Sequence, residues 1–218
     1  MKGSTGLIEI VRVRLSVPGC SELSEKYRDT PMTVVVEVSD DLADWATRAG
    51  YEVNQGSQPP LRDNVDDDGR TVIWANHGEI RYFVGGHASG WFCVTSSERM
   101  SDETLEFAAE SMHLIELYFY GKFGLSLRSS LKLPVLKYPR SADDAVGGYS
   151  LRTATFDERE NLALVDAKGS AIALTTSGRI AGTAELVCLS YYLASTVEAV
   201  KSSYLNPSGQ PLFTVREN

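Results

Sequence analysis

RTVIWANHGEIRYFVGGHASGWFCVT, residues 70–95, contains three short apolar runs separated by turn residues, and the expected architecture follows from them. The runs are residues 70–76, 79–84 and 91–95. They are rich in β-branched and aromatic residues, which favour strands. Asn76-His77-Gly78 is typical of a tight hairpin turn, and the glycine-rich residues 85–90 form the second connection. The stretch therefore predicts three antiparallel strands that follow one another along the chain.

A long amphipathic helix is predicted after these strands. Ser101 is a suitable N-cap, and apolar residues recur behind it at spacings of three and four, which gives the helix one buried face. The members of this face are Leu105, Ala108, Met112, Ile115 and Phe119. We expect the helix to end at Gly121 or Gly124, because glycine often terminates helices.

The second part of the chain repeats this order of elements. Strands are predicted over residues 149–156, 161–166 and 170–175, and an amphipathic helix over about 183–204. Two βββα-like units, at about 70–124 and 149–204, are therefore expected. The predicted fold class is α+β, with an antiparallel sheet packed against long amphipathic helices.

The residues before the first unit are less regular. A short strand is predicted over residues 33–38, a helix over 40–49 and an exposed loop over 54–69. Residues 1–31 are interpreted as an N-terminal extension made of a strand and a loop. Residues 32–218 are interpreted as a single α+β domain that contains the two repeated units.

Composition limits the classes of function. The 218 residues include 21 basic and 29 acidic side chains, which give a formal net charge of −8. A negative chain repels phosphate backbones, so nucleic acid is not an expected partner. No stretch approaches the roughly 20 apolar residues of a membrane span. Cys20, Cys93 and Cys188 lie far apart, as reduced thiols do, and the sequence predicts a cytoplasmic protein without membrane contact.

The chain carries few of the side chains that catalysis uses. Its three histidines are His77, His87 and His113. Cys93 lies in the middle of a predicted strand, which favours core packing over activation by a histidine base. Residues 64–69 resemble the start of a calcium loop, but Ala75 takes the position of the glutamate that should complete it. No catalytic residue, metal or cofactor is therefore expected.

Acidic residues gather in one region of the chain. Residues 37–69 hold nine acids and two bases, so they carry a net charge of −7 out of the −8 of the whole chain. The acids are Glu37, Asp40, Asp41, Asp44, Glu52, Asp63, Asp66, Asp67 and Asp68. A solvated surface is the ordinary interpretation of such a region. A docking patch for a basic partner is the sharper one, because local charge accelerates association.

Several aromatic and glycine-rich stretches form a distinctive set. They are DGRTVIW (68–74), GEIRYFV (78–84), GWFCVTSSER (90–99), IELYFYGKFG (115–124) and LNPSGQPLF (205–213). Together they resemble an actinobacterial immunity-protein family over roughly residues 40–215. That family is similar to the antitoxin of the tuberculosis necrotizing toxin, a secreted NAD glycohydrolase. Residues 1–31 are additional to the usual start of the family.

The resemblance implies an inhibitor and no chemistry of its own. Such a protein binds the cognate toxin in the producing cell and blocks its NAD site stoichiometrically, without catalytic residues. Two alternatives stay open at this point. One is a secretion chaperone for a type VII-like substrate, and the other is a small enzyme of an unrecognised type.

Two loops are the expected partner-binding elements, because a protein that closes a cleft needs protruding segments. The first is the loop 54–69, in which Asp66, Asp67 and Asp68 are expected to mimic the phosphates of NAD. A diphosphate site commonly offers positive potential, which suits these acids. The second is the loop 85–90, which carries His87. A flatter helix or sheet surface is the alternative.

Overall fold

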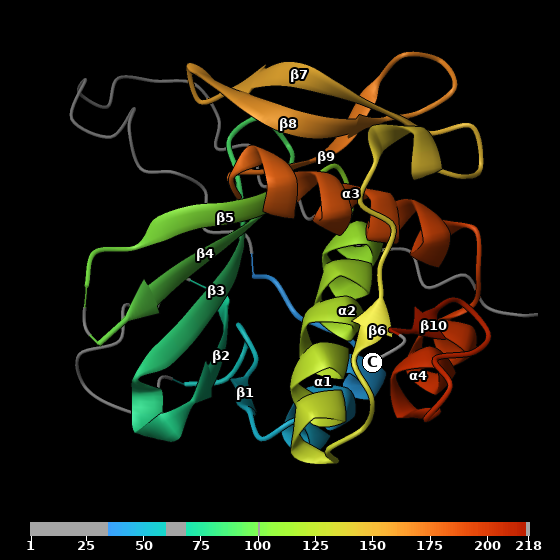
Figure 1. Ribbon diagram of the computed structural model, residues 1–218. Coiled ribbons are helices and arrows are strands. Elements are labelled where there is room, and N and C mark those ends of the chain that lie inside the picture. Colours follow the sequence, from blue (N-terminus) through green and yellow to red (C-terminus); the bar gives the residue numbers. More distant parts are fainter. Residues whose placement is uncertain (1–34, 60–68, 100, 217–218) are drawn as a thin grey trace, which may run out of the picture. The chain divides into compact units, whose positions relative to one another are not determined.

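The computed structural model describes residues 35–59, 69–99 and 101–216, and its central element is an antiparallel sheet of eight strands (Figure 1). In chain order the strands are β1 (Glu52–Asn54), β2 (Thr71–Ala75), β3 (Ile80–Gly86), β4 (Phe92–Glu98), β5 (Thr104–Ala109), β7 (Ser150–Phe156), β8 (Arg159–Val165) and β9 (Ala171–Thr175). Their order across the sheet is β1-β2-β3-β4-β5-β9-β8-β7. The last strand of each predicted unit therefore lies at the centre, where β5 pairs with β9. The predicted α+β fold with antiparallel sheet is confirmed.

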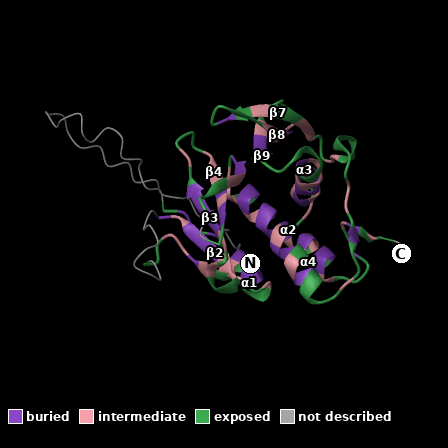
Figure 2. Ribbon diagram, turned by 60° about the vertical axis from the view of Figure 1, so that its left-hand side comes forward, coloured by how far each residue is buried: buried purple, intermediate pink, exposed green. Residues whose placement is uncertain are grey.

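The helices gather on one side of this sheet (Figure 1). They are α1 (Asp40–Arg48), α2 (Met112–Ser130), α3 (Arg179–Leu193) and α4 (Val197–Leu205), with single 3-10 turns at Asn76–Gly78 and Ala142–Asp144. The helix α2 is the middle one and contacts the other three, as well as β4 and β5. A small second sheet pairs β6 (Leu136–Lys137) with β10 (Thr214–Val215). Buried residues follow α2 along its length (Figure 2).

The three strands expected in residues 70–95 are present. Strands β2 and β3 are joined by the predicted turn, in which Asn76 and His77 take positive φ angles of 52° and 57°. Among the aromatic residues of these strands, Tyr82 and Phe83 are buried, whereas Trp74 is half-buried. Alternation along β3 sends Tyr82 toward the helices, where it joins the main core.

The first predicted helix begins later than expected, because Thr104–Ala109 forms the strand β5. A β-bulge explains the error. Leu105 pairs with Thr95 and Phe107 with Val94, so Glu106 is an extra residue that has no pairing partner in β4. The bulge interrupts the normal alternation of side chains. Residues that are three positions apart then share a face, and this spacing is the one that predicts a helix.

The helix α2 passes through both glycines that were expected to end it. A Cβ atom at Gly121 would lie 2.8 Å from the hydroxyl of Tyr192, and one at Gly124 would lie 2.4 Å from the ring of Tyr204. Both glycines therefore allow the rings of neighbouring helices to lie directly against the α2 backbone. Close helix packing, and not termination, is their role here.

The second predicted helix is divided into α3 and α4. The break falls after Leu193, and the N-cap of α4 is Thr196, whose side chain accepts a hydrogen bond from Ala199 N at 3.2 Å. Apolar spacing alone does not reveal this break, because the same periodicity continues on both sides of it. The Tyr192 and Tyr204 hydroxyls hydrogen-bond at 2.6 Å, which joins the two helices.

A buried arginine fixes α2 to the end of α4. Arg128 is 3% exposed. The three nitrogen atoms of its guanidinium group donate hydrogen bonds of 2.7–3.3 Å to the carbonyl oxygens of Pro134, Ser203, Tyr204, Asn206 and Pro207. The side chain thus satisfies carbonyl groups at the C-terminus of α4 that have no partner within that helix. Burial lowers the pKa of Arg128 from its usual value.

The N-terminal predictions have mixed outcomes. Residues 40–49 form the expected helix α1, and the side chain of Ser39 accepts the hydrogen bond from Leu42 N. Residues 35–39 are extended but form no strand, although Val36 and Val38 are buried. The strand β1 was not predicted. The proposed extension, residues 1–31, lies outside the described residues.

Candidate functional site

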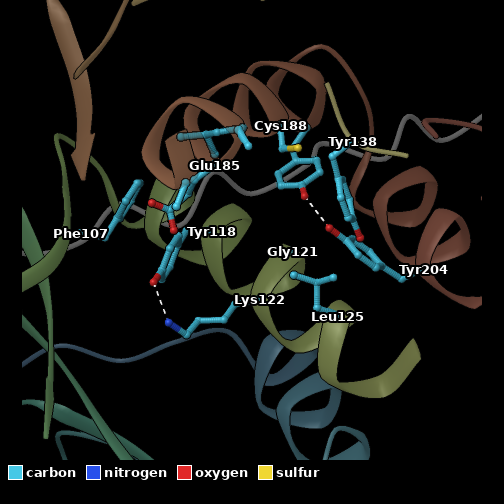
Figure 3. Close-up of a pocket in the computed structure, with 13 residues that line it drawn as sticks. Phe107, Tyr118, Gly121, Lys122, Leu125, Tyr138, Glu185, Cys188 and Tyr204 are labelled. Carbon is cyan, nitrogen blue, oxygen red and sulfur yellow. Dashed lines mark hydrogen bonds between the residues drawn. The ribbon is translucent and has the colours of Figure 1, made fainter. Parts of the chain in front are cut away.

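A pocket of about 320 Å³ lies between α2 and α3, and we call it the α2–α3 pocket (Figure 3). Its lining residues are Phe107, Tyr118, Gly121, Lys122, Leu125, Tyr138, Ala181, Ala184, Glu185, Cys188, Leu189, Tyr192 and Tyr204. Phe107, Tyr118 and Glu185 lie at one end in Figure 3, and Tyr138 and Tyr204 at the other. The volume is near the lower limit of about 300–1,000 Å³ for small-ligand sites. One large side chain or one small molecule would fill it.

The bulge in β5 supplies a carboxylate, Glu106, that binds the lining residues Tyr118 and Lys122. Glu106 Oε2 accepts hydrogen bonds from Lys122 Nζ at 2.6 Å and from the Tyr118 hydroxyl at 2.9 Å. Burial opposes ionisation of Glu106, but the ammonium group of Lys122 and the hydrogen bonds from Ser96 and Tyr118 together outweigh it and hold the pKa of Glu106 below its usual value. The same ammonium lies 4.5 Å from the ring centroid of Tyr82. Lys122 is therefore held in place from several sides.

Glu185 stands opposite this group on α3. It is half-buried, and its Oε2 atom accepts a short hydrogen bond from the hydroxyl of Thr175 in β9. Burial raises the pKa of Glu185 above its usual value, against the opposing effects of that hydrogen bond and of the more distant Lys122 ammonium group. Among the described residues, no basic group lies within 4 Å of the Glu185 carboxylate. The pocket thus contains a carboxylate without a close counter-ion.

A second cluster joins the turns of the two halves, and we call it the turn cluster. It consists of His87, Ser89, Trp91, Phe156 and Asp157. The His87 Nε2 atom lies 3.1 Å from Asp157 Oδ1, and its Nδ1 atom lies 2.8 Å from the Ser89 hydroxyl. The His87 ring lies 4.8 Å from the ring of Phe156. The predicted binding residue His87 is therefore tied to the β7–β8 turn.

The acidic region is only partly described. Asp66, Asp67 and Asp68 lie outside the described residues, so they are not placed relative to His87. Asp41 serves the fold: its carboxylate accepts a hydrogen bond from the Tyr120 hydroxyl at 2.6 Å and forms an ion pair with Lys201. The hydrogen bond from Lys201 is the largest cause that lowers the pKa of Asp41.

The described thiols are not activated. Burial raises the pKa of Cys93 to about 12 and that of Cys188 to about 12, so both remain protonated at neutral pH. Within residues 35–59, 69–99 and 101–216, no three His, Cys, Asp or Glu side chains gather as they would around a metal ion. None of the helices in these ranges has the length and apolar character needed to cross a membrane.

Comparison with known proteins places these features in a family. The model of the family described as Immunity protein 61 matches residues 45–212. The chain belongs to the Immunity protein 61 family. The immunity-family resemblance that the sequence stretches predicted over residues 40–215 is thereby confirmed.

Two mycobacterial relatives and one solved structure resemble this member of the Immunity protein 61 family over most of its length. The "Immunity factor for TNT" of Mycobacterium tuberculosis is 42% identical over 184 residues, which cover 84% of this chain and 97% of that protein. The "Immunity factor for TNT homolog" of Mycobacterium bovis has the same identity and coverage. The solved structure of "Rv3902c from M. tuberculosis" is similar with a TM-score of 0.74 and 41% identity, and the match covers 85% of this chain and 98% of that one.

The sequence did not reveal the α2–α3 pocket of this Immunity protein 61 member. Glu106 and Lys122 come together only because of the bulge in β5, which was predicted as helix. Glu185 was placed on an amphipathic helix, but nothing in the spacing showed that its neighbour would be the polar end of β5. A glutamate among apolar helix residues was the one available signal.

Proposed function

We propose that this chain is the immunity protein of a TNT-type toxin and that it inhibits the toxin by blocking its NAD site. The observation that carries the proposal is the 42% identity over 97% of the length of the immunity factor for TNT. The family match over residues 45–212 supports the same role. In this proposal TNT is the NAD-degrading glycohydrolase, and inhibition takes place in the cytoplasm of the producing cell.

The proposed contact surface includes the acidic loop and the turn cluster. The loop contributes Asp66, Asp67 and Asp68, whose charges would occupy the part of the toxin that receives the diphosphate of NAD. The turn cluster offers His87, and the neighbouring residues 88–90 are exposed. The exposed Asp157 beside His87 adds a further negative charge to this surface.

A direct test compares charge removal at the loop with the same charge removal elsewhere. The test variant carries Asp66→Ser, Asp67→Ser and Asp68→Ser. The matched control carries Glu110→Ser, Asp143→Ser and Glu198→Ser, three exposed acids outside the acidic region. Each protein is titrated into the cognate toxin domain, and NAD hydrolysis and the dissociation constant are measured at low and moderate salt.

The two parts of the proposal fail in different ways. Wild-type protein that leaves NAD hydrolysis unchanged at stoichiometric excess would reject the inhibitor function. If the wild type inhibits, the loop variant should bind more weakly and with a smaller salt dependence than the control. Equal affinities and equal salt slopes for the two variants would reject the acidic loop as the contact surface.

A further inference from the structure

The α2–α3 pocket has an unbalanced charge. Its charged lining residues are Glu185 and Lys122, and the ammonium group of Lys122 is already bonded at 2.6 Å to Glu106, which lies behind the lining. The structure therefore leaves Glu185 with a hydroxyl donor, Thr175, but without a cation in contact. A positively charged group that entered the pocket would complete this arrangement.

The walls of the pocket suit an aliphatic chain that ends in a flat cation. Leu125, Ala184 and Leu189 provide apolar surface along the pocket. The rings of Phe107 and Tyr118 are stacked beside Glu185, with centroids 4.4 Å apart and an angle of 9° between them. Aromatic rings and a carboxylate together favour guanidinium over ammonium, because guanidinium is planar, is weakly hydrated and stacks on aromatic groups.

The opening of the pocket indicates a protein as the source of this group. Leu125 at the rim is 48% exposed, and Ile180, next to the rim residue Ala181, is 84% exposed. Exposed apolar side chains around a pocket are typical of surfaces that another protein covers. An arginine that is buried at the centre of such a contact is a common source of binding energy.

We propose that the α2–α3 pocket receives one arginine side chain of the toxin, with the guanidinium group beside Glu185 and the aliphatic part along Leu125 and Ala184. This inference rests on the proposed function, since it names an anchor within the toxin complex. It adds a binding site on the helical side of the molecule to the loops described above.

The proposal also gives the acid at this position a purpose. A carboxylate that is half-buried without a counter-ion is unfavourable in the free protein, and glutamine would fill the same space without charge. In the complex the arginine would compensate the charge of Glu185. Residues that lower stability in the free state often serve binding.

The experiment uses two variants of the pocket and a control for each. Glu185→Gln removes the charge but keeps an acceptor for Thr175, and Glu198→Gln removes one exposed charge on α4. Ala181→Trp places a bulky group at the exposed rim, and Ala167→Trp places one in the exposed β8–β9 turn. Circular dichroism and thermal melting show that each full-length variant is folded. Affinity for the cognate toxin domain is measured by calorimetry.

The pocket variants should each weaken toxin binding by about tenfold or more, and the control variants by less than about twofold. Replacing the toxin's exposed arginines one at a time by alanine should identify one whose loss is not additive with Glu185→Gln. Wild-type affinity in both pocket variants would overturn the proposal, as would additivity with every arginine.

A second measurement separates this inference from the proposed function. If the wild type does not bind the toxin, the proposed function is rejected, and so is the proposal that the pocket receives an arginine of the toxin. The chemistry of the pocket is then decided by titrating propylguanidinium into the protein and following backbone amide shifts by NMR. Saturable shifts in α2 and α3 that are absent in Glu185→Gln would retain a guanidinium site. Equal shifts in both proteins, or none, would reject that site as well.

Discussion

The helices that follow the two halves of the sheet have contrasting surroundings. The helix α2 follows β5 and buries eleven of its nineteen residues, including four aromatic rings and Arg128. The helix α3 follows β9, buries seven of fifteen residues and exposes 84% of Ile180 in its first turn. The helix α2 thus lies at the centre of the core, whereas α3 covers the core from one side and lines, together with α2, a pocket that is open to solvent. Two units with the same order of elements therefore place their helices in different surroundings.

The largest expected effect tests the α2 side of this comparison. Arg128→Met should lower the free energy of unfolding by about 3 kcal/mol or more, because several carbonyl groups at the end of α4 lose a charged donor. Urea denaturation measures the change. Arg179→Met, which removes an exposed arginine at the start of α3, is the control and should stay within about 0.5 kcal/mol. Similar losses in both variants would contradict the assigned role of Arg128.

A smaller loss is expected from one added methyl group. Gly124→Ala should cost about 1–3 kcal/mol, since the new Cβ atom would lie 2.4 Å from the ring of Tyr204. Gly178→Ala at the N-cap of α3 provides the control for an added methyl group in open space, because no atom lies within 4 Å of its Cβ position. Thermal unfolding of the two variants gives the comparison. If Gly124→Ala is neutral, α2 and α4 do not need the close approach described here.

The pocket side of the comparison predicts a gain in stability when the charge of Glu185 is removed, and the size of the gain depends on pH. The pKa of Glu185 is raised in the folded state, so its contribution to stability is present below the unfolded pKa, about 4.3, and is lost as the pH rises through the folded value. Glu185→Gln should therefore be more stable than wild type at pH 8. The difference should shrink at pH 5, and denaturation at both pH values measures it. A gain that is independent of pH would contradict the raised pKa.

The smallest effect is expected at the turn cluster. His87→Ala should lower the stability by less than about 1 kcal/mol, because the ion pair with Asp157 is exposed to solvent and His87 packs on one face of Phe156 only. Denaturation in low and moderate salt measures the loss. A cost above about 2 kcal/mol would show that the two turns hold the halves together and are not merely adjacent.

The fold could be predicted wherever side-chain alternation or helical spacing was undisturbed. Strands β2, β3, β4, β7, β8 and β9 and the buried face of α1 are of this kind. The prediction of a helix over the residues of β5 was wrong, because the bulge at Glu106 imitates helical spacing. The break between α3 and α4 was missed because apolar spacing continues across Ser195. A bulge in a strand or a break in a helix changes the backbone hydrogen bonds but leaves the order of apolar and polar residues nearly unchanged. The residue pattern therefore does not predict such interruptions.

The candidate site was harder to predict than the fold. His87 was chosen because it lies in a protruding turn, yet its contact with Asp157 depends on the arrangement of two hairpins seventy residues apart in sequence. The pocket depends on the meeting of Lys122 and Glu185 from two helices, and the bond from Lys122 to Glu106 adds a third element. Such meetings follow from sheet order, and the order β5-β9 at the centre cannot be derived from the strands themselves.

The bulge at Glu106 also determines which change in chain length β5 can accept. Leu105 pairs with Thr95 and Phe107 with Val94, so the two residues that flank Glu106 already face opposite sides of the sheet. Deleting residue 106 would therefore leave a regular strand in which Phe107 to Ala109 keep their partners and their faces. The deletion would remove the Glu106 carboxylate, with its bonds to Lys122 and Tyr118, and the extra twist that a bulge gives a strand. A single-codon deletion at this position should thus resemble a substitution of Glu106 and not a slip in register.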